Sequence, residues 1–99
     1  MTAQEIKAIL EEKLSIEDFA FEEFDEDELG LGPIKTIEQK GGEGEGDEWY
    51  IIFHFTEHNI YLKCDGYYQS YNGTEFYNGW DDCFEVKPKQ VEVTIYENI

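Results

Sequence analysis

WYIIFHFTEHNIYLKC, residues 49–64, contains two runs in which apolar side chains occupy every second position. A β-strand places successive side chains on opposite faces, so each run predicts a strand with one buried face. The residues His58 and Asn59 between the runs indicate a turn, which predicts that the two strands pair antiparallel. The alternating positions are Trp49, Ile51, Phe53 and Phe55 in the first run and Ile60, Leu62 and Cys64 in the second.

Further strands are predicted on both sides of this hairpin. Residues 34–39 form a modest strand pattern, and residues 91–96 carry the cleanest alternation in the chain. Turn signals separate these segments because glycine, asparagine, aspartate and proline adopt the backbone conformations that turns require. The signals lie at residues 41–46, 65–66, 72–73, 78–79 and 87–89. We therefore expect five or six antiparallel strands.

The N-terminal third predicts a helix followed by an ambiguous segment. Residues 3–14 place apolar side chains on one helical face, and Thr2 with Glu5 fits a capping box. Residues 15–29 are compatible with a second helix capped by Ser15, which would bury Ile16, Phe19, Ala20 and Phe24. Phe19 and Phe21 also alternate as in a strand, and we interpret the segment as a short strand or turn.

These elements predict an α+β fold in which one N-terminal helix packs on an antiparallel sheet or half-barrel. Ninety-nine residues are enough for one domain, residues 1–99. No long apolar run predicts a membrane span, and no secretory signal pattern opens the chain. We therefore expect a cytoplasmic protein whose two cysteines, Cys64 and Cys83, are reduced.

The charge is strongly acidic and uneven. The chain has 24 acidic residues against seven basic ones, all lysine, and a net charge of −17. Eleven acidic residues and two lysines lie within residues 1–30, a net charge of −9 for that segment. This surplus excludes direct nucleic-acid binding through basic side chains, because phosphates would be repelled. A basic protein is the partner that this charge favours.

No segment of the chain matches the residue pattern of a known catalytic or metal-binding motif. The glycine-rich residues 41–46 lack the lysine of a phosphate loop and are flanked by acids, which indicates a hairpin loop or an acidic loop for a partner's lysine or arginine. A calcium loop beginning at Asp25 places Leu29 and Thr36 at ligand positions. His54 and His58 lie at a strand end, where four residues span about 13 Å. Two histidines this far apart cannot bind the same metal ion. We expect no metal, no cofactor and no enzymatic activity.

The segment 67–80 is rich in aromatic residues separated by polar residues and glycine. Such mixtures occur where rigid amphipathic rings meet a partner, and a sugar ring is one partner that they can stack on. We expect about half of these rings to pack inside the domain. The candidates for a binding surface are Tyr67, Tyr68, Tyr71 and Trp80.

Several short motifs resemble a family of small acidic bacteriophage proteins without an assigned activity. They are Glu38-Gln39-x-Gly41-Gly42-Glu43-Gly44-x-Gly46, Trp49-Tyr50, Phe55-x-x-His58-x-Ile60-Tyr61, Asp65-Gly66-Tyr67-Tyr68-x-Ser70-Tyr71-x-Gly73-Thr74-x-Phe76 and Glu85-Val86-x-Pro88. The resemblance covers about residues 34–96 and supplies no catalytic residue. It implies a phage origin and hence a bacterial cytoplasm. In composition the chain is similar to phage proteins that block nucleic-acid-handling host enzymes, including restriction and CRISPR effectors.

The sequence thus predicts a non-enzymatic protein that inhibits a basic host protein by DNA mimicry. The alternative is a protein- or sugar-binding module that uses residues 67–80, or a structural or accessory phage protein. Mimicry requires rows of carboxylates that occupy a groove built for phosphates. The candidate rows contain Glu11, Glu12, Glu22, Glu23, Asp25, Glu26, Asp27 and Glu28, and the loop residues Glu43, Glu45, Asp47 and Glu48.

Overall fold

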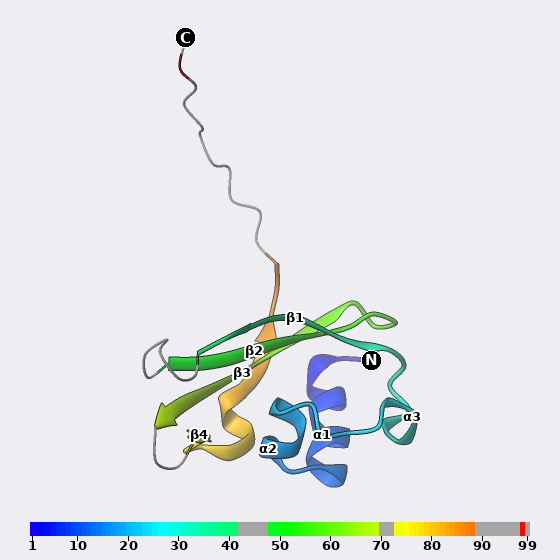
Figure 1. The fold of residues 1–99 in the computed structure, drawn as a ribbon. Coiled ribbons are helices and arrows are strands. Elements are labelled where there is room, and N and C mark those ends of the chain that lie inside the picture. Colours follow the sequence, from blue (N-terminus) through cyan, green and yellow to red (C-terminus); the bar gives the residue numbers. More distant parts are fainter. Residues whose placement is uncertain (42–47, 70–72, 89–97, 99) are drawn as a thin grey trace.

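A five-stranded antiparallel sheet with all of its helices on one face is the framework of the protein (Figure 1). The structure, a computed structural model, describes residues 1–41, 48–69, 73–88 and 98. The helices are α1 (Ala3–Lys13), α2 (Ile16–Ala20), α3 (Glu26–Leu29) and the 3-10 helix η1 (Gly79–Asp82). The strands are β1 (Ile34–Lys40), β2 (Glu48–Phe55), β3 (Ile60–Gln69), β4 (Gly73–Glu75) and β5 (Cys83–Val86). The predicted α+β fold is confirmed, and its sheet is open.

The helix α1 begins at the predicted capping box. The Thr2 side chain accepts a hydrogen bond from the Glu5 backbone amide, and the Glu5 carboxylate accepts one from the Thr2 amide. Ile6 and Leu10 are fully buried on the inner face. Leu14, in extended backbone, ends the helix one residue earlier than the sequence predicted.

Residues 15–29 form two short helices joined by a turn, so the interpretation of the segment as a short strand or turn was wrong for α2 and α3. The Ser15 hydroxyl accepts a hydrogen bond from the Asp18 amide at 3.2 Å and starts α2. The helix buries Phe19, whereas Phe21 lies beyond its end and is exposed. The alternation of these two phenylalanines therefore reflects a helix terminus. The alternative reading as a capped helix was the better one.

The second short helix in this region, α3, is also capped at both ends. The Asp25 carboxylate accepts a hydrogen bond from the Asp27 amide at 3.0 Å. Gly30 ends the helix with φ +67°, a left-handed conformation that suits glycine. The chain then reaches β1 through Leu31, which is buried.

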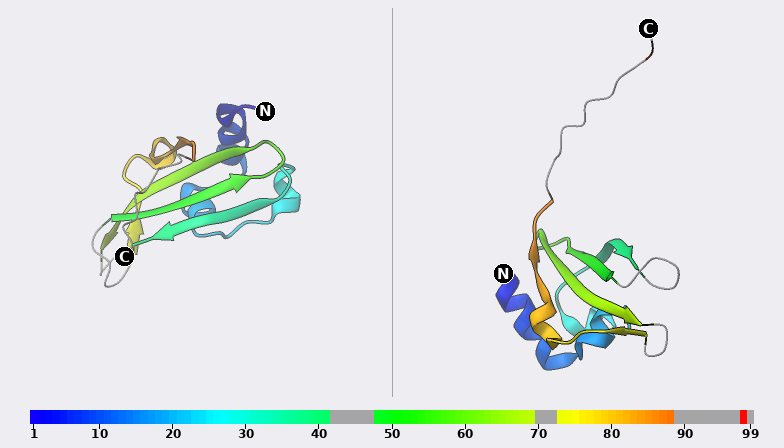
Figure 2. Two further views of the ribbon diagram at one scale, coloured as in Figure 1. Left: turned by 90° about the horizontal axis from the view of Figure 1, so that it is seen from above. Right: turned by 90° about the vertical axis from the view of Figure 1, so that its left-hand side faces the viewer.

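The strand β3 is the longest and pairs along both edges. One edge pairs with β2, and the other pairs with β5 near its beginning and with β4 near its end (Figure 2). The predicted strands at residues 34–39, 49–55 and 60–64 are confirmed, as is the turn at His58 and Asn59. The predicted strand at residues 91–96 lies outside the described residues.

The predicted turn at Asp65 and Gly66 was wrong, because β3 continues through both residues to Gln69. Gly66 is paired with Trp49 of β2. A Cβ atom on Gly66 would lie 2.6 Å from the Thr74 Cγ2 atom and 3.0 Å from the Phe76 ring. The glycine therefore allows close packing between neighbouring strands. Close approach is one reason why glycine occurs within a strand.

The hydrophobic core lies between the helices and the inner face of the sheet. Phe53 and Phe55 of β2 and Leu62 of β3 project toward the helices and are fully buried. The Phe19 ring of α2 lies 4.5 Å from the Phe53 ring, centroid to centroid, and 5.7 Å from the Trp80 ring of η1. One core thus joins all the layers.

Candidate functional site

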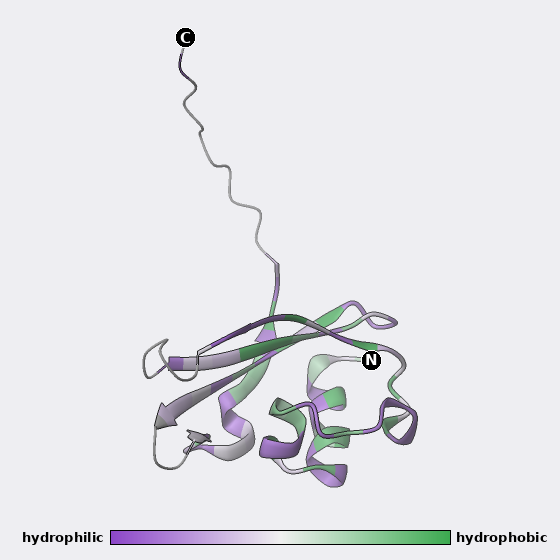
Figure 3. Cartoon of the chain, viewed as in Figure 1, coloured by the Kyte–Doolittle hydropathy of each residue, from purple (hydrophilic) through white to green (hydrophobic). Residues whose placement is uncertain are grey.

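The helices and the connection between α2 and α3 carry the acidic surface, named here the acidic helical layer. It contains Glu5, Glu11, Glu12, Glu17, Asp18, Glu22, Glu23, Asp25, Glu26, Asp27 and Glu28. All of these residues except the half-buried Asp18 are exposed. In Figure 3, hydrophilic stretches mark the ribbons of α2 and α3 below the sheet. The structure therefore brings the predicted acidic residues of the N-terminal third into one layer.

Ion pairs do not neutralise this layer within the described part of the chain. The single ion pair there joins Lys63 and Asp65 of β3 at 3.4 Å. Lys13 of α1 donates to the backbone carbonyl of Glu28 at 2.8 Å, so this lysine fixes α1 to α3. The carboxylates consequently face solvent with their charge uncompensated.

A few acidic side chains have structural roles as well. The hydrogen bond from the Thr2 backbone lowers the pKa of Glu5, and the Thr2 side chain lowers it further. Asp25 caps α3, and Glu26 accepts a hydrogen bond from the Ile34 amide at 2.8 Å. Substitutions meant to test charge alone should therefore avoid these three acids.

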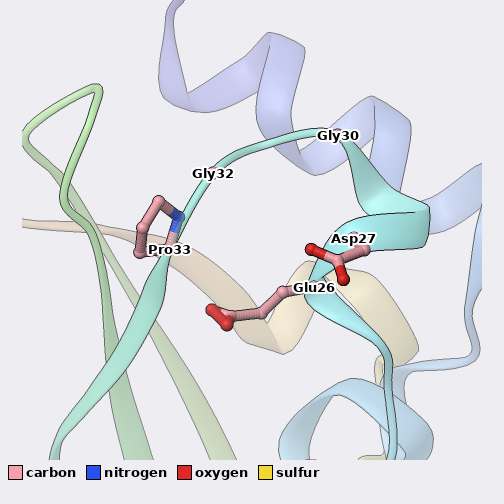
Figure 4. Close-up of a pocket in the computed structure, with 5 residues that line it drawn as sticks. All are labelled: Glu26, Asp27, Gly30, Gly32 and Pro33. Atoms are coloured by element: carbon pink, nitrogen blue, oxygen red, sulfur yellow. The ribbon is translucent and has the colours of Figure 1, made fainter.

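A shallow pocket of about 290 Å³ lies between α3 and the start of β1 (Figure 4). Figure 4 shows the Glu26 side chain pointing from α3 toward Pro33, while Asp27 lies nearer the helix. Gly32 lines the same pocket, and a Cβ atom there would lie 2.5 Å from the Glu57 carboxylate. The described residues contain no group of three histidines, cysteines or carboxylates placed to hold a metal ion.

Crowded like charges predict that salt stabilises the fold. Raising NaCl should increase the melting temperature by about 4–8 °C, which corresponds to about 1 kcal/mol for a domain of this size. Differential scanning calorimetry measures the change. The variant Glu11→Gln, Glu12→Gln, Glu23→Gln should show a smaller rise. An unchanged or lowered midpoint would mean that bound cations or geometry already neutralise the carboxylates.

The predicted acidic loop is only partly described. Glu43, Glu45 and Asp47 lie outside the described residues. Glu48 begins β2, is exposed and pairs in register with Tyr67 of β3. Glu48 therefore lies on the sheet, away from the acidic helical layer.

The aromatic segment 67–80 does not form one surface. Tyr68 and Trp80 pack against the core, whereas Tyr67 and Tyr77 are 38% and 66% exposed. The rings of Tyr67 and Tyr77 lie 6.1 Å apart. Tyr71 lies outside the described residues. Strand alternation in β3 separates Tyr67 from Tyr68, so half of the predicted ring cluster belongs to the interior.

The structure adds a surface that the sequence analysis missed. No described element covers the face of the sheet opposite the helices (Figure 1). We name it the open sheet face. Strand register places on it Lys35, Glu38, Lys40, Glu48, Tyr50, Ile52, His54, Tyr61, Lys63, Asp65, Tyr67, Glu75, Phe84 and Val86. Three lysines nearly balance four acids there, so this face has a net formal charge of only −1. The alternation in the sequence could have revealed this surface, because Tyr50, Ile52 and His54 occupy the positions between the buried residues of the strand.

Ring contacts order the open sheet face. The rings of His54 and Tyr61 stack at 4.1 Å with an interplanar angle of 1°. The Lys63 ammonium lies 4.5 Å from the centroid of the Tyr50 ring. Partial desolvation raises the pKa of the Tyr50 phenol, and a hydrogen bond with Glu38 adds to the effect. These contacts fix amphipathic side chains in place on an open surface.

The histidines occupy different environments. His54 Nε2 lies 3.2 Å from the Asn59 Oδ1 atom, and its ring faces Tyr61. His58 lies in the turn that follows β2, and its backbone amide donates to the Phe55 carbonyl. The two histidines therefore belong to separate local arrangements.

Comparisons with protein-family models, with curated proteins and with solved structures find no match to this chain. Within the described residues, none of the helices is long and apolar enough to cross a membrane.

Proposed function

We propose that this protein is a phage-type inhibitor that acts in the bacterial cytoplasm. Its acidic helical layer docks in the basic groove of a nucleic-acid-handling host protein, such as a restriction or CRISPR effector. The protein works by binding its partner. It needs no catalysis, no cofactor and no direct contact with nucleic acid. The observation that carries the proposal is the segregation of charge, with eleven acidic residues on the helices and the connection between α2 and α3, and a nearly balanced open sheet face.

The physical basis is the match between two charge densities. Double-stranded DNA carries one charge per about 1.7 Å, and the grooves of its binding proteins are lined with lysine and arginine. The carboxylates of Glu11, Glu12 and Glu23 are exposed, and no described lysine pairs with them. A groove that binds phosphates can exchange its counterions for these carboxylates. The folded helices hold the carboxylates at low entropic cost.

The test is inhibition of purified host nucleases, with restriction and CRISPR effectors as the probes. We expect one of them to lose cleavage activity when the protein is added, and a competing uncleavable duplex to restore it. Affinity should fall at least about 100-fold between about 50 and 200 mM salt. Fluorescence anisotropy of the labelled protein measures this dependence.

Matched charge reversals locate the binding surface. Glu11→Lys, Glu12→Lys, Glu23→Lys should abolish inhibition. The control Glu38→Lys, Glu48→Lys, Glu75→Lys changes the net charge equally on the open sheet face, opposite the acidic helical layer, and should retain inhibition. At physiological salt, charges interact only over a Debye length of about 8 Å. The two variants therefore differ through the position of the new lysines, since their net charge is the same. Equal losses in both variants would contradict a role for the acidic helical layer.

The second candidate is a protein- or sugar-binding module, favoured by the exposed pair Tyr67 and Tyr77 at the open sheet face, whose charges nearly balance. Binding through these rings would be nearly independent of salt. Tyr67→Ala with Tyr77→Ala would abolish it and spare inhibition of a nuclease. These two residues are better targets than Tyr68, which packs against the core.

A further inference from the structure

Cys64 and Cys83 lie opposite each other on neighbouring strands. They are Cα partners in the antiparallel register of β3 and β5. Both are free thiols, and neither has any exposed surface. The proximity of Cys83, together with burial, raises the pKa of the Cys64 thiol. Nineteen positions separate them in the sequence, and the fold brings them together.

The register of the two strands suits a covalent bond. Directly opposite residues in antiparallel strands have Cα atoms about 4.5–5.5 Å apart. Disulfides span Cα separations of about 4.4–6.8 Å. The side chains of opposite residues also project from the same face of the sheet. Disulfide formation therefore needs little movement of the backbone.

We propose that Cys64 and Cys83 form an oxidisable dithiol that reacts with a low-molecular-weight disulfide such as glutathione disulfide. The Cys83 thiolate attacks one sulfur of glutathione disulfide, which forms a mixed disulfide and releases one glutathione thiol. Cys64 then attacks the Cys83 sulfur and displaces the second glutathione. Two electrons pass from the dithiol to glutathione disulfide, and the two protons end on the glutathione thiols.

Cys83 is the entry point because of its position in the fold. It belongs to β5, a strand of four residues that pairs, among the described strands, only with β3. Cys64 lies within β3, between β2 and β5. A cleft of about 300 Å³, with Lys7 on its wall, borders Cys83. Local opening of β5 thus exposes Cys83 first, as expected for a short strand that pairs with a single described neighbour.

The reaction is slow while the protein is closed. The proximity of Cys83 and burial keep the pKa of the Cys64 thiol raised. Only the thiolate attacks a disulfide, so a protected thiol reacts mainly when the strand opens. The dithiol therefore stays reduced in a reducing cytoplasm and responds to sustained oxidation.

The bond would close a loop of the chain from residue 64 to residue 83. Residues 64–83 include β4 and η1 as well as Tyr67 and Tyr77. Closing this loop restricts the unfolded chain, which stabilises the native fold. The melting temperature should rise by about 5 °C or more on oxidation.

The experiment treats the folded, full-length protein with glutathione disulfide and then alkylates the remaining thiols in denaturant. Mass spectrometry should show the loss of two hydrogen atoms and no alkylation. Non-reducing peptide mapping should join the peptides that contain Cys64 and Cys83. Dithiothreitol should restore both thiols and the original melting temperature.

The variants Cys64→Ser and Cys83→Ser provide the control for the order of the reaction. Cys64→Ser should accumulate the mixed disulfide at Cys83, whereas Cys83→Ser should react much more slowly. Wild-type protein that remains fully alkylatable, stops at a glutathione adduct or forms only linked dimers would overturn the proposal. The wild-type measurement decides the question even where a variant folds poorly.

Discussion

Phe19→Ala is expected to lower the free energy of unfolding by about 3–5 kcal/mol, a large part of the stability of a domain of this size. The Phe19 side chain is fully buried, and its ring contacts those of Phe24, Phe53, Phe55 and Trp80. Alanine would leave a cavity where α2, the sheet and η1 meet. Urea denaturation followed by tryptophan fluorescence measures the loss.

The matched control is Phe21→Ala. Phe21 is 41% exposed and contacts Trp49 and Phe76 at the margin of the core. Its removal should cost about 1–2 kcal/mol, because less apolar surface is buried there. In a strand, Phe19 and Phe21 would lie on the same face and cost similar amounts. Equal losses would therefore contradict the helical assignment of α2.

Gly66→Ala should destabilise the protein by about 2 kcal/mol, although alanine is the better residue for an ordinary strand. The added methyl group would meet Thr74 Cγ2 at 2.6 Å and the Phe76 ring at 3.0 Å. The side chains of Thr74 and Phe76 must shift to make room for the methyl group. Thermal and urea unfolding of the variant measure the cost.

A double-mutant cycle identifies the clash. Thr74→Ser removes the Cγ2 atom and keeps the hydroxyl group. Gly66→Ala should cost about 1 kcal/mol less in the Thr74→Ser background, since residues in contact are not additive. A cost that is the same in both backgrounds would contradict the contact with Thr74. A stabilising Gly66→Ala would overturn the packing argument altogether.

Local patterns in the sequence predicted much of the framework. The capping box of Thr2 and Glu5 located α1, and strict alternation located β2 and the first half of β3. Residues 15–29 were harder because α2 has only five residues, too few for a helical period to outweigh the accidental alternation of Phe19 and Phe21. Gly66 was misread because Thr74, eight residues further along the chain, comes against it only through the pairing of β3 with β4.

The candidate surfaces were predictable in composition and less so in arrangement. The acidic residues of the N-terminal third are exposed as expected, since charged side chains seldom lose water without a partner. The split of the aromatic segment depends on the register of β3, which places Tyr67 outward and Tyr68 inward. The open sheet face depends on where the helices pack, and strand patterns alone do not specify that choice.

The separation of charge between the two faces gives the described part of the molecule a permanent electric dipole. One pole is the acidic helical layer, with a net formal charge of −9 over residues 1–30, whereas the open sheet face has a net formal charge of only −1. A cationic surface therefore exerts a torque as well as an attraction within about one Debye length. The torque turns the protein before contact, so that the acidic helical layer reaches the cationic surface first.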